Sequence, residues 1–156
     1  MDITYFDKNF SAYACVGDSI TTQIGGLTAV ATLYHDDSPS LPWVDDDGFW
    51  PSRNPAHAGY MGEHATEAEY LQQDRFCNHV KTSYELDQWC YVGVAVRIFF
   101  GEMPLTEEFT NALWSVDCNY PGSNNTHLRS HANDLLEDAL NEAKATIKRL
   151  ASLNID

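Results

Sequence analysis

Residues 19–34 read SITTQIGGLTAVATLY, and this stretch decides the fold. Gly25-Gly26 is a two-residue turn of the kind that β-hairpins favour. Pairing across this turn places one mostly apolar set of side chains on a single face: Ile20, Thr22, Ile24, Leu27, Ala29, Ala31 and Leu33. The opposite face is polar. The stretch therefore predicts a half-covered antiparallel sheet.

Residues 89–100 predict a second, more deeply buried strand. Alternate positions are apolar without a polar break: Cys90, Val92, Val94, Val96, Ile98 and Phe100. The other set, Trp89 to Phe99, is also largely apolar. Such a strand lies centrally in a sheet, or its second face is covered by an aromatic loop or by a second subunit. A homodimer is one expectation that follows.

Two helices and one short strand complete the predicted fold. Thr66 and Glu69 form a capping box, which predicts a helix to about Ser83. A second helix is expected after a cap at Ser123 or Asn125, with an apolar stripe from Leu128 to Leu150. Residues 112–118 predict a strand with one shared side: Ala112, Trp114, Val116 and Cys118.

These elements do not alternate as βαβ units would. We therefore expect an α+β fold, with an antiparallel β-sheet of about four strands, two helices packed on it, and a long ordered loop. The length of 156 residues predicts that residues 1–156 form a single domain.

The long loop spans residues 36–62 and is both acidic and aromatic. A loop of this length inside a compact domain is usually functional or disordered, and large aromatic residues argue against disorder. Aromatic side chains beside charges are common in recognition surfaces and also as packing covers. The candidate binding residues are Trp43, Asp45, Asp46, Asp47, Phe49, Trp50 and Tyr60.

Metal sites have only weak candidates in this sequence. His35, Asp36 and Asp37, together with the Asp45–Asp47 turn, could supply ligands to a hard cation. Their spacing is not that of an EF-hand, and three consecutive aspartates point in divergent directions. The alternative is a solvated acidic turn, so no metal or cofactor is assigned.

Catalytic motifs are incomplete. Gly17-Asp18-Ser19-Ile20 is similar to the nucleophile block of the GDSL hydrolases, but the Gly-x-Asn-Asp and Asp-x-x-His blocks are absent. His127 and His131 lie four residues apart without the glutamate of a zinc-protease motif, which favours two surface histidines. No catalytic residue is assigned, and a non-enzymatic role is favoured.

The net charge of −14 restricts the partners. Nucleic-acid binding requires a basic face, and anionic membranes repel an acidic protein. A protein with a basic or mixed surface remains as the expected partner, although acidity also serves solubility. The first residues lack the features of a signal peptide, and no apolar run is long enough to span a membrane, so a cytoplasmic location is expected.

Several ordered segments resemble one family: small acidic proteins encoded by phages, plasmids and other mobile elements. The segments that carry the resemblance are VGDSITT with GG (residues 16–26), DDGFWPS (46–52), AGYMG (58–62), WCYVGV (89–94), LWSV (113–116), DCNYPGSNN (117–125) and ANDLL (132–136). Many relatives carry Gly-Ile where this chain has Ser115-Val116. The resemblance implies an accessory gene on mobile DNA and transfers no catalytic residue.

Three functional hypotheses follow. The first is a protein-binding module that acts through the acidic, aromatic loop. The second is a DNA mimic, in which spaced carboxylates block a host DNA-binding or defence enzyme, although the acids lack a regular stripe. The third is a small divalent-cation-binding protein or enzyme that uses the two aspartate clusters.

Overall fold

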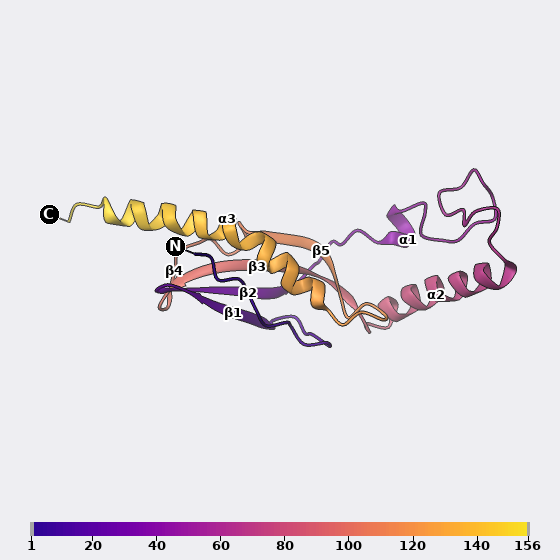
Figure 1. Ribbon diagram of the computed structural model, residues 1–156, viewed down its shortest axis with the longest axis horizontal. Coiled ribbons are helices and arrows are strands. Elements are labelled where there is room, and N and C mark those ends of the chain that lie inside the picture. Colours follow the sequence, from indigo (N-terminus) through magenta and orange to yellow (C-terminus); the bar gives the residue numbers. More distant parts are fainter. Residues whose placement is uncertain (1, 156) are drawn as a thin grey trace. The chain divides into compact units, whose positions relative to one another are not determined.

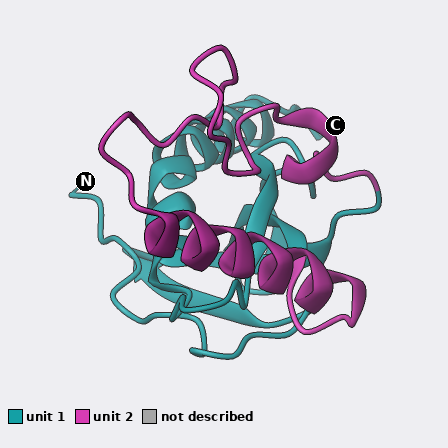
Figure 2. Ribbon diagram, turned by 90° about the vertical axis from the view of Figure 1, so that its right-hand side faces the viewer, with its two compact units in different colours: residues 1–37, 91–156 teal, residues 38–90 magenta. Residues whose placement is uncertain are grey.

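The computed structural model describes residues 2–155, which fall into two compact units (Figure 2). Unit 1 comprises Met1–Asp37 and Tyr91–Asp156, and unit 2 comprises Ser38–Cys90. The α+β class and the antiparallel sheet predicted from the sequence are confirmed. Within residues 2–155, no helix combines the length and the apolar character that crossing a bilayer requires.

The sheet has five strands (Figure 1). Its order is β1-β2-β3-β4, with antiparallel pairing between neighbours, and β5 also pairs with β3. The bounds are β1 Ser19–Ile24, β2 Leu27–His35, β3 Cys90–Phe100, β4 Met103–Pro104 and β5 Ala112–Cys118. Strand β3 is thus the common partner of three strands.

The predicted hairpin is confirmed with its register. Ile24 lies opposite Leu27 across the Gly25-Gly26 turn, and Ser19 lies opposite Thr32. The face that the sequence marked as apolar is buried along both strands, from Ile20 to Leu33. Thr22, the one polar member of that face, is buried as well.

Strand β3 is buried on both faces, as its sequence indicated. Val92, Val94, Val96 and Ile98 are fully buried on one face, and Ala95 is 2% exposed on the other. Helix α3, Thr126–Ala151, contacts β5 within the same unit. It buries the first two thirds of its predicted stripe: Leu128, Ala132, Leu136, Ala139, Leu140 and Ala143.

A left-handed residue interrupts β5. Ser115 has φ 58°, a conformation that favours glycine. The predicted shared side holds for Val116 and Cys118, which are buried, but is wrong for Trp114, which is 42% exposed. The alternation of side chains breaks at Ser115, and the Trp114 indole lies against Gly93 instead. A Cβ on Gly93 would come 2.4 Å from Cε3 of that ring.

Asp36 holds this interruption in place. Its Oδ2 accepts hydrogen bonds from Ser115 N at 2.8 Å and Ser115 Oγ at 3.3 Å. Its own backbone N–H donates to Tyr91 O at 3.3 Å, and Asp36 is buried. The sequence suggested Asp36 as a weak cation ligand, whereas in the structure its carboxylate accepts hydrogen bonds from β5.

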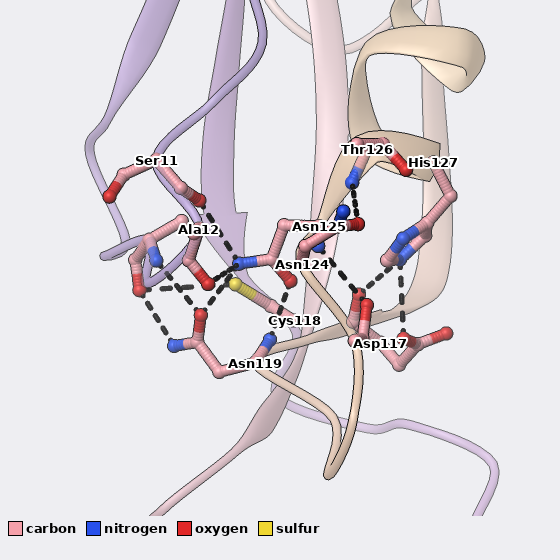
Figure 3. A network of polar contacts seen from close by, with 11 residues as sticks. Ser11, Ala12, Asp117, Cys118, Asn119, Asn124, Asn125, Thr126 and His127 are labelled. Atoms are coloured by element: carbon pink, nitrogen blue, oxygen red, sulfur yellow. Dashed lines mark hydrogen bonds and ion pairs between the residues drawn. The ribbon is translucent and has the colours of Figure 1, made fainter.

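Two asparagines bind the N-terminal segment to the turn before α3 (Figure 3). Asn119 pairs with Ala14 in both directions, because its Oδ1 accepts from Ala14 N and its Nδ2 donates to Ala14 O, each at 2.8 Å. Asn125 Nδ2 donates to Ser11 O and Ala12 O, each at 3.2 Å. Asn125 occupies the predicted N-cap position in a left-handed conformation, yet its side chain makes no cap hydrogen bond.

A third asparagine extends the same pattern along α3. Asn133 Oδ1 accepts from Phe6 N at 2.8 Å, and Asn133 Nδ2 donates to Phe6 O at 3.2 Å. Asparagine side chains therefore satisfy backbone groups that a neighbouring strand would otherwise satisfy. This gives a structural role to Asn119 and Asn125 of the CNYPGSNN segment and to Asn133 of the ANDLL segment.

We expect Asp36→Ala to destabilise the protein by about 1–3 kcal/mol, because it leaves the Ser115 N–H without its acceptor. Urea denaturation measures the change. Asp37→Ala is the matched control, since the Asp37 side chain is 92% exposed. Equal effects of the two substitutions would contradict the assigned role of Asp36.

We expect Gly93→Ala to displace the Trp114 indole, because the added methyl group would overlap its ring. The substitution should lower stability by about 1–3 kcal/mol and shift tryptophan emission to longer wavelength. Gly26→Ala is the control, since a Cβ there meets no atom within 4 Å. Unchanged emission from Gly93→Ala would contradict the packing described.

Candidate functional site

Residues 38–62 of the acidic, aromatic loop lie in unit 2 and include helix α1, Pro42–Asp45. Helix α2, Glu67–Glu85, follows in the same unit. The predicted capping box of α2 is confirmed: Glu69 N donates to Thr66 Oγ1 at 3.1 Å, and Thr66 N donates to Glu69 Oε2. Helix α1 was not anticipated. Pro42 at its first turn suits a helix start because the missing N–H has no partner to lose there.

Two of the three consecutive aspartates order their own backbone. Asp45 Oδ2 accepts from Leu41 N at 2.9 Å and from Ser40 Oγ at 3.1 Å. Asp46 Oδ1 accepts from Gly48 N at 2.8 Å. These bonds stabilise the turn, and each carboxylate still faces water, since Asp45, Asp46 and Asp47 are all exposed. The turn that carries the three charges is therefore held in a defined conformation.

The aromatic side chains of the loop form a cluster with α2 and the residues that follow it. Ring centroids of Trp43 lie 5.8 Å from Phe49, 5.2 Å from Tyr84 and 6.2 Å from Trp89. Trp50 continues the cluster at 5.0 Å from Phe49. Edge-to-face contacts of this kind stabilise by about 0.5–1.5 kcal/mol each beyond area burial.

Burial differs sharply within the cluster. Trp89 is 2% exposed, and its Nε1 donates to Val80 O at 2.8 Å. Trp43, Phe49 and Trp50 are half-buried. The loop aromatics therefore pack and also leave part of their surface in contact with solvent, beside the exposed carboxylates.

Two further contacts hold the loop. Cys77 of α2 donates its thiol hydrogen to Phe49 O at 3.2 Å. Within the loop, Gly59 lies so close to Trp50 that a Cβ would lie 1.9 Å from Trp50 O, and Ser52 N donates to Gly59 O at 2.9 Å. Only glycine fits at that position.

Tyr60 lies at a different feature of unit 2, a cavity of about 300 Å³. Arg53 and Glu67 form an ion pair at this cavity, and the Arg53 guanidinium lies 3.7 Å above the Tyr70 ring. Both charged side chains are more than half exposed, so the pair contributes little to stability. The sequence carried no spacing signal for this group.

Ser52 and His57 also meet at this cavity's edge, with Oγ and Nδ1 2.8 Å apart. Asn54 adds further contacts to this pair. Its Oδ1 accepts from Ala56 N, its Nδ2 lies 3.4 Å from His57 Nε2, and its N–H donates to Ser52 Oγ. The three side chains thus form a local polar network within the loop.

The metal candidates are not brought together. His35 Nε2 lies 3.5 Å from Asp37 Oδ1 on the surface, and Asp36 turns to Ser115. Among residues 2–155, no group of three or more His, Cys, Asp or Glu side chains is arranged to hold an ion. His127, expected on the surface, is half-buried, and its Nε2 lies 2.7 Å from Asp117 O and 3.2 Å from Asp117 Oδ2 (Figure 3).

Comparisons with known proteins found no match to a family model, to a curated protein or to a solved structure. The functional argument therefore rests on the geometry of the site itself.

The Cys77 contact to the loop predicts a pH dependence. Burial raises the pKa of the Cys77 thiol above its ordinary value. As pH rises, the thiol therefore loses its proton in the unfolded chain before it does so in the folded protein. The protonated Cys77 thiol contributes its full stabilisation of the folded state below the ordinary thiol pKa, and this stabilisation is lost as pH rises through the raised pKa of the folded state. Thiol-reagent kinetics should show a higher midpoint pH and a slower rate for Cys77 in the folded protein than for the same thiol in the urea-unfolded protein. Equal midpoints would contradict this assignment.

Proposed function

We propose that this protein is a protein-binding module without catalytic activity, and that it binds through the acidic, aromatic loop of unit 2. The observation that carries the proposal is the exposure of Asp45, Asp46 and Asp47 on a loop whose conformation is set by its own hydrogen bonds. A preorganised surface loses little conformational entropy on binding.

The charge of unit 2 supports a basic or mixed partner surface. Acidic residues outnumber basic ones by nine to three between Ser38 and Cys90, and Arg53 is already paired with Glu67. An excess of this size steers oppositely charged surfaces into encounter. The half-exposed indoles of Trp43 and Trp50 supply apolar contact area beside the charges, a combination common at interfaces.

The resemblance to proteins of mobile elements suggests a search for the partner among host proteins. In a capture experiment from a host lysate, the partner is the protein that the wild-type chain retains and that a variant without the loop charges does not retain.

We expect Asp45→Asn/Asp46→Asn/Asp47→Asn to weaken the captured complex about tenfold, because three charges are removed while each amide keeps an acceptor oxygen. The dissociation constant is measured by calorimetry at two salt concentrations, and wild-type affinity should fall as salt rises.

The matched control is Asp134→Asn/Glu137→Gln/Asp138→Asn on α3, which removes the same charge from unit 1. The control should change affinity less than threefold, as expected of charges that are not part of the proposed binding loop. An equal loss in both variants, or an affinity indifferent to salt, would contradict the proposal.

A further inference from the structure

An apolar groove lies in unit 1 at the C-terminal end of α3. Its volume is about 520 Å³. Leu27 of the hairpin, Phe100, Met103 and Leu105 form one side, and Ile147 and Leu150 of α3 form the other. Figure 1 shows the last turns of α3, in yellow, running past the ends of the strands. The groove therefore lies where α3 extends beyond the ends of the strands.

The α3 side chains at the groove are exposed, whereas earlier side chains of the same apolar stripe are buried. The apolar stripe of the helix is covered as far as Ala143, whereas Ile147 and Leu150 are 42% and 45% exposed. On the opposite side Phe100 is 60% exposed and Met103 is 46% exposed. Contiguous exposed apolar side chains of this kind mark an interaction surface.

The charges beside the groove have opposite signs on its two walls. Lys144 and Lys148 lie one turn apart on α3, next to Ile147 in the helical repeat. Glu102 lies in the β3–β4 turn, between the lining residues Phe100 and Met103. All three side chains are exposed, and none forms an ion pair within the described part of the chain.

A partner surface that is uniformly acidic or uniformly basic would be repelled by the wall that carries charge of the same sign. A second copy related by a two-fold axis along the groove avoids this conflict, because the axis exchanges the walls. The lysine wall of each copy then faces the Glu102 wall of the other. The same rotation places the exposed Phe100 of each copy opposite the α3 wall of the other.

We propose that this groove is the interface of a symmetric homodimer. Each copy contributes its α3 wall to one half of the interface and its β3–β4 turn to the other half. The interface lies in unit 1 and uses no residue of the acidic loop of unit 2. It is independent of the proposed function, since neither depends on residues of the other.

Charge exchange between the walls provides the test. Lys144→Glu/Lys148→Glu places acids on both walls, and Glu102→Lys places bases on both, so each variant alone should dimerise at least about tenfold more weakly than wild type. In an equimolar mixture the two variants are complementary at both halves of the interface. Native mass spectrometry should then show the heterodimer as well over half of all dimers, half being the share that random pairing of the two variants would give.

An apolar substitution completes the test. Leu150→Glu should abolish dimerisation in sedimentation equilibrium, whereas Leu71→Glu on α2, an equally exposed leucine at 40%, should leave it unchanged. A wild-type protein that stays monomeric at all accessible concentrations would overturn the proposal. A dimer that survives Leu150→Glu, or a mixture without heterodimer, would overturn it equally.

Discussion

Strand β3 is buried on both faces, and the rest of unit 1 depends on this constraint. Three strands pair with β3, and its second face is also largely apolar, so that face needs apolar cover as well as the face toward the core. Part of that cover is the Trp114 indole over Gly93. It is possible because Ser115 is left-handed, and the buried Asp36 carboxylate holds Ser115 in that conformation. One carboxylate thus determines which way a strand presents its tryptophan.

Unit 2 contains a polar segment with few helices or strands, and side-chain contacts hold that segment in place. Its aromatic cluster supplies the packing, with Trp89 sealed and Trp43 half-buried beside it. Its aspartates supply acceptors for backbone groups that no strand or long helix satisfies. The same carboxylates remain in water. The same aspartates therefore stabilise the loop and expose negative charge to solvent, which is why the loop supports a binding role.

The hairpin, β3 and the start of α2 could be predicted because each has a local cause: a glycine pair, an uninterrupted alternation and a capping box. The reversal at Ser115 could not, because it depends on Asp36, 79 residues away. Asn119 and Asn125 read as turn and cap residues, and their long-range bonds to Ser11 and Ala14 have no sequence signature. For the loop, the sequence identified the exposed acids, while the Ser52–His57–Asn54 contacts required coordinates. The division into two units likewise arises from contacts, and the prediction of one domain stays a prediction.

The central claim is that the acidic loop is a fixed surface. Amide hydrogen exchange tests it most directly, because the N–H groups of Leu41, Gly48 and Ser52 are donors in the bonds that hold the loop. The account predicts that these three amides exchange at least about a hundredfold more slowly than in an unfolded chain. Exchange at the unfolded rate would show a mobile loop and would contradict the account.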